Sequence, residues 1–324
     1  MADLVFGCRQ RWPWIGGDLQ TLRDTLIVPR WPADTAQRRF VPLPDGGSLL
    51  LKLDLPSQAD PRGGVLLVHG LAGSSDRSGV RRLAHLLVQS GFVVWRLNLR
   101  GAGEGRALAS GTYAAACNRD LSPVLAAVRQ EVGGRPLLGV GFSLGGTVLL
   151  NALLAQPDGL DALACVSSPL DLAACSRQIA RPRNALYQHY LLRGLIQQTL
   201  ADPFATPSDL PTNLKGVRTI RGFDALITAP RWGYANVDHY YEEASPLARI
   251  ISGAPLPPLL LIHALDDPLV PVASLLGLAG QRLAAVEACL QRWGGHNGFH
   301  GADDPPASSW ADRVVVDWLS QRCS

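Results

Sequence analysis

One serine stands among glycines in the stretch LLGVGFSLGGTVLL, which runs from Leu137 to Leu150. Its centre, Gly141-Phe-Ser143-Leu-Gly145, matches the pattern GxSxG, in which a serine sits on a sharp turn between a strand and a helix. Residues two before and two after the serine must be small, because the strand and helix backbones pass close together there. A serine held in this way predicts a nucleophile for acyl transfer.

The same stretch also fits a looser pattern, GxGxxxG, from Gly139 to Gly145. In that interpretation the glycines let a pyrophosphate approach the start of a helix. Two features argue against it. The stretch follows at least the third strand–helix unit, whereas the dinucleotide pattern belongs to the first. The acidic residue expected about 20 positions later should end the next strand, but Asp161 opens it. The nucleophile interpretation is therefore favoured.

A serine nucleophile needs a base, and the base needs a carboxylate that orients it. Two later segments, HALDDPLVP and GGHNGFH, supply an acid and then a histidine, in the order typical of a GxSxG protein. In the first segment Asp267 is favoured over Asp266, because it directly precedes the proline, and Asp266 is then expected to cap the turn. In the second segment His296 is favoured over His300, because the glycines around it form a loop that can aim the ring at Ser143.

The tetrahedral intermediate of acyl transfer needs backbone N–H donors for its oxyanion. One donor is expected from Leu144, the residue after the nucleophile, and the other from Leu71 in the segment VHGLAGSSD. His69 is expected to shape that loop rather than to react. Arg100, in the glycine-rich segment NLRGAGEG, could pair with a carboxylate or contact the substrate, and a structural role is favoured.

Apolar runs that alternate with helix-like segments place these loops at the ends of strands. The runs predict strands at residues 47–55, 64–70, 92–98, 135–141, 160–168, 257–264 and 286–293, and helices at 80–90, 118–132, 144–155 and 308–319. Strands that are apolar on both faces indicate a mostly parallel sheet covered by helices on both sides, which is an α/β fold. Ligands bind at the carboxyl ends of such strands, where the glycine-rich loops lie.

The alternation stops between residues 169 and 257, where the sequence predicts helices but no clear strand. We expect a helical cap inserted into a single domain of residues 1–324, preceded by an N-terminal arm of about residues 1–40. The amphipathic stretch 185–200 and the aromatic residues of the insertion either line an apolar acyl pocket or only pack the cap onto the core.

Composition excludes several other classes. The 324 residues carry a formal net charge of +3, which predicts no nucleic-acid partner. No basic leader and no run of about 18 apolar residues is found, so we expect no membrane span and a cytoplasmic location. The six cysteines have no metal-like spacing, so we expect buried thiols, no metal and no cofactor. The sequence makes no prediction of oligomeric state.

Several motifs together resemble the α/β-hydrolase superfamily, and more narrowly its YheT-like branch. The matching segments are VHGLAGSS, NLRG, GFSLGG, HALDDPLVP, GGHNGF and, in the insertion, TIRGFDALITAPRWGYANVDHYYEEASPL. Near the N-terminus, GGDLQTL resembles the HLQT segment of the branch, although Asp18 replaces the usual histidine. The resemblance covers nearly the whole chain.

The resemblance implies serine-dependent ester hydrolysis, with Ser143, Asp267 and His296 as the triad. It implies a carboxylesterase that acts on small-molecule acyl esters of short or medium chain length, with lipid substrates among the candidates. Two alternatives stay open at this point. The same triad could transfer the acyl group to an alcohol or cleave lipids as a lipase or phospholipase, or the fold could serve as a non-catalytic binding protein.

Overall fold

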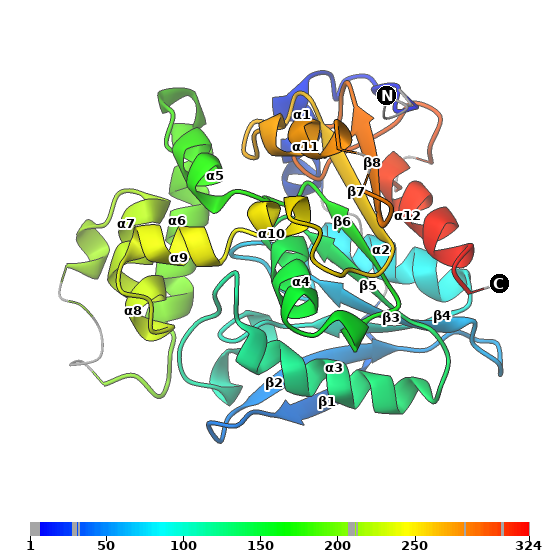
Figure 1. The fold of residues 1–324 in the computed structure, drawn as a ribbon, viewed down its shortest axis with the longest axis horizontal. Coiled ribbons are helices and arrows are strands. Elements are labelled where there is room, and N and C mark those ends of the chain that lie inside the picture. Colours follow the sequence, from blue (N-terminus) through cyan, green and yellow to red (C-terminus); the bar gives the residue numbers. More distant parts are fainter. Residues whose placement is uncertain are drawn as a thin grey trace.

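The computed structural model describes residues 7–27, 31, 33–206, 211, 213–281, 283–305 and 308–323. Within these residues eight strands form one sheet in the order β1-β2-β4-β3-β5-β6-β7-β8 (Figure 1). The strands are β1 Gln37–Pro42, β2 Ser48–Asp54, β3 Gly63–Val68, β4 Phe92–Leu97, β5 Leu137–Phe142, β6 Ala162–Val166, β7 Leu259–Ala264 and β8 Val286–Gln291. Strands β1 and β2 are antiparallel to their neighbours, and all other pairs are parallel. The predicted, mostly parallel α/β sheet is confirmed.

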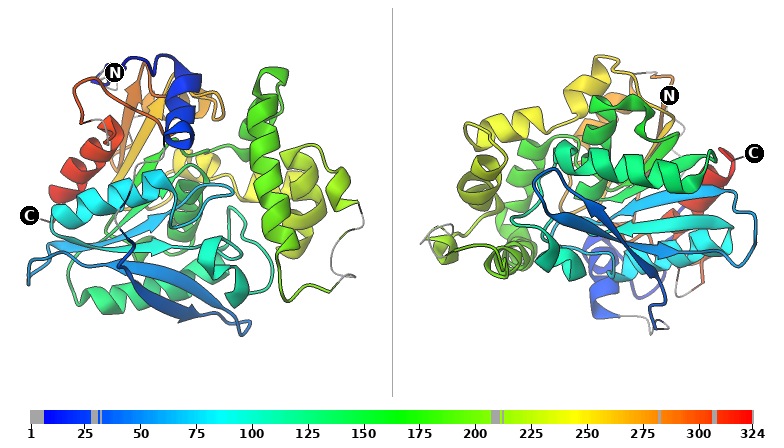
Figure 2. Two further views of the ribbon diagram at one scale, coloured as in Figure 1. Left: turned by 180° about the vertical axis from the view of Figure 1, so that it is seen from behind. Right: turned by 90° about the horizontal axis from the view of Figure 1, so that it is seen from below.

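Helices cover both faces of this sheet, as the apolar strands require (Figures 1 and 2). Helices α2 and α12 share a hydrophobic cluster with one face, and α3, α4 and α11 share a second cluster with the other. The bounds are α2 Ser78–Gln89, α3 Asn118–Val132, α4 Leu144–Ala155, α11 Ala273–Ala279 and α12 Trp310–Ser320. Two separate apolar layers therefore fix the strands from both sides.

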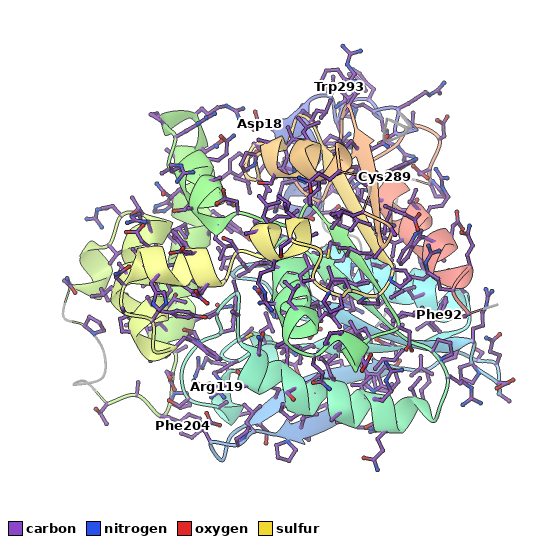
Figure 3. All side chains as sticks on the ribbon, viewed as in Figure 1. Asp18, Phe92, Arg119, Phe204, Cys289 and Trp293 are labelled. Atoms are coloured by element: carbon purple, nitrogen blue, oxygen red, sulfur yellow. The ribbon has the colours of Figure 1, made fainter. Side chains whose placement is uncertain are left out.

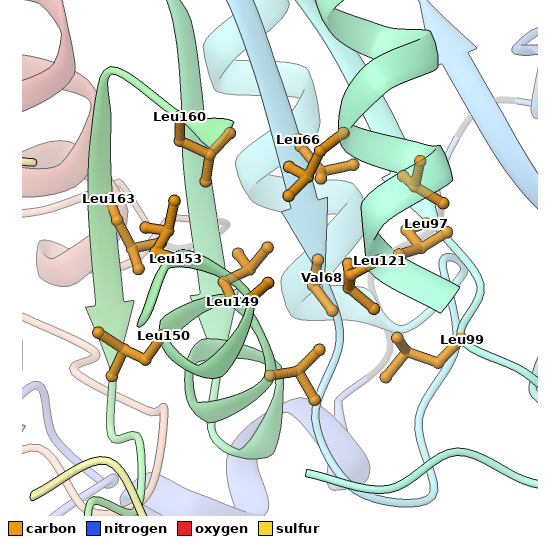
Figure 4. Close-up of a cluster of buried hydrophobic side chains, with 14 of the residues drawn as sticks. Leu66, Val68, Leu97, Leu99, Leu121, Leu149, Leu150, Leu153, Leu160 and Leu163 are labelled. Carbon is orange, nitrogen blue, oxygen red and sulfur yellow. The ribbon is translucent and has the colours of Figure 1, made fainter. Parts of the chain in front are cut away.

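Strand β3 shows how one short sequence serves both layers. Val65 and Leu67 point to the α2 and α12 side, whereas Leu66 and Val68 point to the α3 and α4 side. Figure 4 shows Leu66 and Val68 among leucines of α3, α4 and neighbouring strands. At the carboxyl end of β3, Val68 pairs with Gly141 of β5. The chain therefore leaves the two central strands side by side, and the loops that follow them meet.

The chain between β6 and β7 is helical in its described part, as predicted. Its helices are α5 Leu172–Ile179, α6 Ala185–Leu200, α7 Ile220–Phe223, α8 Ala229–Arg231, α9 Val237–Glu243 and α10 Leu247–Ile251, with a π-helical turn at Asp224–Thr228. Helices α6 to α9 lie together beside the sheet, on the left in Figure 1. We call residues 169–257 the helical segment. No helix among the described residues is both long and apolar enough to cross a bilayer.

The N-terminal part of the chain departs from a simple arm. Strand β1 begins at Gln37 and pairs with β2, so the last residues of the expected arm belong to the sheet. The earlier residues include helix α1, Gly17–Leu26. Asp24 of α1 and Asp312 of α12 both pair with the buried Arg82 of α2, which ties α1 to the helices on that face. In the left view of Figure 2, α1 (blue) lies at the level of the upper end of α6, the tall green helix.

Candidate active site

Ser143 occupies the turn between β5 and α4 in a backbone conformation that side chains rarely adopt, with φ 50° and ψ −125°. The glycines around it are required by close backbone approach. A Cβ at Gly141 would overlap the backbone of Gly146, and a Cβ at Gly145 would overlap the carbonyl oxygens of Val68 and His69. Any larger residue at either glycine would push strand and helix apart, so the turn depends on both.

The structure brings Ser143, His296 and Asp267 into one chain of hydrogen bonds. The Nε2 atom of His296 lies 2.9 Å from Ser143 Oγ, and its Nδ1 atom lies 2.9 Å from Asp267 Oδ2. A carboxylate can only accept, so Nδ1 carries the proton and Nε2 is left with a lone pair facing the serine hydroxyl. This tautomer can accept the Ser143 proton.

Asp267 is buried, and its second oxygen is also occupied. Oδ1 accepts hydrogen bonds from the backbone N–H groups of Leu269 and Val270 at 2.8 and 2.9 Å. Burial opposes ionisation, but the charge and hydrogen bond of His296 and the backbone donors hold the pKa of Asp267 below its ordinary value. The carboxylate is therefore fixed in orientation and charged.

The two alternatives weighed from the sequence lie elsewhere. The His296 ring pairs with Asp267 rather than Asp266, whose Oδ1 accepts the N–H of Gly295 at 2.9 Å and so braces the loop that carries His296. His300 is buried with its Nε2 3.4 Å from Asp24 Oδ1, and burial beside two arginines lowers its pKa to about 3. The structure places Asp267 and His296, not these neighbours, beside Ser143.

The loop after β3 lies against the serine. A Cβ at Gly70 would meet Ser143 Cβ at 3.0 Å, so the loop backbone approaches the serine closely. Ala72 adopts φ 54°, and its N–H donates to the buried hydroxyl of Tyr113 at 2.8 Å. Among the described residues nothing accepts the backbone N–H of Leu71 or of Leu144. The two N–H groups predicted for the oxyanion are therefore both available beside Ser143.

His69 holds this loop from within. Its Nδ1 faces the carbonyl oxygen of Gly70 at 2.8 Å, and its Nε2 faces the N–H of Leu99 at 3.2 Å. A carbonyl accepts and an amide donates, so His69 is a neutral imidazole protonated on Nδ1. Burial lowers its pKa to about 4, in keeping with that state. Its ring also contacts Tyr113 edge to face, which agrees with the predicted role in shaping the loop.

Arg100 lies in a structural ion-pair cluster. Its guanidinium donates to both carboxylate oxygens of the buried Asp120 at 2.8 Å and pairs with Asp45. The cluster joins the loop after β4 to the start of α3. The prediction that Arg100 pairs with a carboxylate is confirmed.

Two adjoining cavities meet beside His296. A smaller one of about 190 Å³ is lined by Ser143, Leu144 and mostly apolar side chains of the helical segment: Leu172, Cys175, Ile179, Leu191, Ile220 and Tyr240. A larger groove of about 780 Å³ runs between α1, the loop after β3 and α6. Leu71, Leu191 and His296 border both. The hydrogen bonds between Ser143, His296 and Asp267 therefore lie where a small, mostly apolar cavity adjoins a larger groove.

One polar cluster in the smaller cavity has no counterpart in the site predicted from the sequence. Asp224 accepts hydrogen bonds from Thr228 and Tyr241 at 2.7 Å, and Tyr241 lies 3.2 Å from Ser176. No cation pairs with Asp224 among the described residues, and burial raises its pKa to about 6. Asp224, Thr228 and Tyr241 belong to the segment containing FDALIT and HYYEE, which carries the resemblance but has no assigned role in the sequence analysis, whereas Ser176 lies in α5.

Helix α1 also contributes residues that sequence reasoning left without a role. Asp18, labelled in Figure 3, accepts from Arg183 at 2.9 Å and from the hydroxyl of Tyr187 at 3.0 Å. It therefore links α1 to α6 and to the turn just before α6. Thr21 accepts the backbone N–H of His296 at 2.8 Å. Asp18 and Thr21 both belong to the GGDLQTL motif. The role of that motif could not be inferred from the sequence, because its partners are distant in the chain.

The cysteines take no part in the hydrogen-bonded chain. Four are buried as predicted, and two are partly exposed, against the prediction, because one lies on the edge strand β8 and the other just after α12. The buried four are Cys8, Cys117, Cys165 and Cys175, and the two partly exposed ones are Cys289 and Cys323. In the described part of the chain no group of three or more His, Cys, Asp or Glu side chains is arranged to hold a metal ion.

Comparison with known proteins identifies the family of the chain. A family model described as the alpha/beta hydrolase fold matches residues 64–302. YheT of Escherichia coli (strain K12) is 33% identical over 92% of this chain and 86% of its own length. Phospholipase ABHD3 of Homo sapiens is 30% identical over 95% of this chain and 77% of its own length. The chain therefore belongs to the α/β-hydrolase fold family, and within it to the branch that includes YheT.

A solved structure shows the same fold at low identity. The esterase Pf2001 of Pyrococcus furiosus matches with a TM-score of 0.59 at 14% identity, over 91% of this chain and 97% of its own. At this identity the likeness concerns the path of the chain alone.

Proposed function

We propose that this protein is a serine esterase that cleaves acyl esters through an acyl-enzyme intermediate, with Ser143 as nucleophile, His296 as general base and Asp267 as the orienting acid. The observation that carries the proposal is the chain of hydrogen bonds from Ser143 through His296 to Asp267, built on a strained turn. The names of the relatives, which include a phospholipase, support an ester as the substrate class.

The reaction would proceed in two steps. His296 Nε2 takes the hydroxyl proton as Ser143 Oγ attacks the ester carbonyl, and the imidazolium then gives the proton to the departing alcohol. Water enters, His296 removes its proton, and the resulting attack releases the acid and restores Ser143. The N–H groups of Leu71 and Leu144 would hold the oxyanion in both steps, since neither is engaged by another described group.

The two cavities suggest where each half of the substrate lies. The 190 Å³ cavity reaches Ser143 and is largely apolar, so we assign it to the acyl chain. An apolar cavity of about 150 Å³ accommodates benzene, so this one would take roughly six to eight carbon atoms. The larger groove opens from His296 between α1 and α6, where the departing alcohol would be protonated. In this proposal the helical segment acts as the predicted cap.

Ser143→Ala tests the proposal directly. We expect it to lower hydrolysis of p-nitrophenyl butyrate by at least about 10³-fold, because no other group replaces the nucleophile. We also expect it to abolish labelling by a fluorophosphonate probe. Ser122→Ala, on the exposed face of α3, is the matched control and should retain activity. Full residual activity of Ser143→Ala would refute the mechanism.

The substrate assignment needs a separate measurement. A series of p-nitrophenyl esters from two to twelve acyl carbons should show kcat/KM rising to about six to eight carbons and falling beyond. Product analysis with added ethanol separates hydrolysis from acyl transfer, because transfer would yield the ethyl ester. A non-catalytic binding protein would show neither turnover nor probe labelling.

A further inference from the structure

The first described residues run along the loop that carries His296. We call residues 7–27 the arm and residues 294–302 the histidine loop. Gln10 and Gly301 form an antiparallel bridge, Arg11 N–H donates to His300 O at 3.1 Å, and Ala302 N–H donates to Arg9 O at 2.7 Å. The two segments are nearly 300 residues apart in the sequence, yet they pair like strands.

Helix α1 of the arm then supplies side chains to the loop backbone. Thr21 Oγ1 accepts the N–H of His296 at 2.8 Å while its own proton goes to Gly17 O at 2.6 Å. Gln20 is fully buried; its Oε1 accepts the N–H of His300 at 2.6 Å, and its Nε2 lies 3.2 Å from His300 O. The histidine loop is thus held at His296 and at His300 by neighbouring residues of one helix.

The contact is close enough to demand glycine on both sides. A Cβ at Gly17 would overlap the carbonyl oxygen of Asp266, and a Cβ at Gly298 would overlap that of Gln20. Gly295, at φ +56°, has no room beside Gly17 O. We call residues 265–272, which carry Asp267, the acid loop. The arm therefore lies directly against both the acid loop and the histidine loop, with no side chains between the backbones.

We propose that the arm is a positioning element of the active site, in which the Thr21 hydroxyl fixes the backbone of His296 so that the imidazole spans Asp267 and Ser143. The inference rests on the proposed function, because it assigns Thr21 a role through the base. Thr21 touches no reacting atom. It acts on the backbone of His296. Its hydroxyl proton is donated to Gly17 O, so the lone pair that accepts the His296 N–H has a fixed direction.

The consequence is a loss of turnover rather than of substrate binding. Without the Thr21 acceptor the His296 N–H is unpaired in a partly buried site, and the loop can relax to pair it elsewhere. A displacement of about 1 Å at a catalytic group can cost on the order of 10²-fold in rate. We therefore expect Thr21→Val, which keeps the shape and removes the hydroxyl, to lower kcat by about 10- to 100-fold with little change in KM.

Three variants form the test. Thr21→Val should lower kcat and the rate of fluorophosphonate labelling by the same factor, and Thr21→Ser, which restores the hydroxyl, should recover most of both. Thr35→Val, exposed in the loop before β1, is the matched control and should behave as the unmodified protein. A Thr21→Val protein with unchanged labelling and kcat, or a Thr21→Ser protein as impaired as Thr21→Val, would overturn the proposal.

A second variant reaches the same contact by steric means, should Thr21→Val fail to fold. Gly17→Ala should push α1 away from the acid loop and lower kcat, whereas Gly277→Ala, with open space around it in α11, should not. Normal kcat in a folded Gly17→Ala protein would contradict a positioning role. The Ser143→Ala result stands apart: if that variant keeps its activity the proposed function fails, and if it is inactive while Thr21→Val is normal only this inference fails.

Discussion

The Nε2 atom of His296 lies 2.9 Å from the Oγ atom of Ser143, although 153 residues separate the two in the chain. Parallel strands produce this meeting. Ser143 follows β5 and His296 follows β8, and the carboxyl ends of both strands lie at the same edge of one sheet. What the sheet does not determine is the tautomer of the imidazole, and that is set by Asp267.

Replacing Asp267 with asparagine should therefore change the tautomer of the His296 imidazole. The Asp267 Oδ1 atom accepts from the backbone N–H groups of Leu269 and Val270, so an asparagine would leave its oxygen there and turn its NH₂ group toward His296 Nδ1. Nδ1 would then have to accept, Nε2 would carry the proton, and the base would be lost. We expect kcat to fall by about 10⁴-fold, the loss typical of a wrong tautomer in a Ser-His-Asp triad.

Asp266→Asn is the matched control for this change. Its amide oxygen can still accept the N–H of Gly295, so we expect kcat within about threefold of the unmodified protein. Nitrogen NMR of the His296 ring would report the tautomer directly. Equal losses from the two variants would show that the acid has been assigned to the wrong residue.

Tyr113 gives a second prediction, which concerns the loop after β3 that carries the Leu71 N–H. Its hydroxyl accepts the N–H of Ala72, the residue after Leu71, in a buried position. Tyr113→Phe leaves that N–H without an acceptor, which we expect to destabilise the fold by about 1–3 kcal/mol. The loop would no longer hold the Leu71 N–H in one direction, so kcat should fall by roughly 10-fold. This loss is less than the 10²-fold or more expected when an oxyanion donor is removed outright.

Chemical denaturation and steady-state kinetics check both parts of this prediction. Tyr234→Phe, in the helical segment between α8 and α9, serves as the control for loss of a tyrosine hydroxyl. A Tyr113→Phe protein whose kcat is unchanged while its KM rises would place Tyr113 in substrate binding and contradict the positioning role.

The sequence was sufficient for the parts of the molecule that local patterns control. Short, continuous apolar runs located the parallel strands. The turn around Ser143 is possible only because glycines stand two residues before and two residues after it in the chain. The acid and histidine loops follow strands, so their chain order alone placed Asp267 and His296 at one sheet edge. The choice between Asp266 and Asp267 rested only on a neighbouring proline, and the structure places Asp267 beside the imidazole.

What the sequence did not indicate depends on contacts between distant segments. Strand β1 is mostly exposed and reads as polar, because only one side of it meets the core. Thr21 lies on a short helix whose partner is the loop some 275 residues later, so no local pattern reveals its bond to His296. Asp224 looks like any acidic residue of a surface helix until the π-helical turn directs it into the cavity beside Tyr241.

Asp224 yields the last prediction, which concerns stability and pH. Its carboxyl group lies in the cavity beside Ser143 with two hydroxyl donors and, among the described residues, no cation to pair with, and burial raises its pKa from 3.8 to about 6. Between about pH 4 and pH 6 the folded protein therefore holds a proton at Asp224 that the unfolded chain has released. Stability must then fall as the pH rises through this window, and the loss is complete above the folded pKa.

Asp224→Asn removes this titration while keeping an oxygen for one of the two hydroxyls. The free energy of unfolding of the unmodified protein, measured in urea at pH 4, 5, 6 and 7, should decline relative to that of the variant as the pH rises. A pKa change from 3.8 to about 6 sets an upper limit of roughly 3 kcal/mol on the relative decline, because water in the cavity moderates the cost. Groups such as Asp267, whose lowered pKa works in the opposite direction, are present in both proteins and cancel in the difference. Parallel stability curves for the two proteins would mean that Asp224 titrates as an ordinary carboxyl group and is not an isolated buried charge.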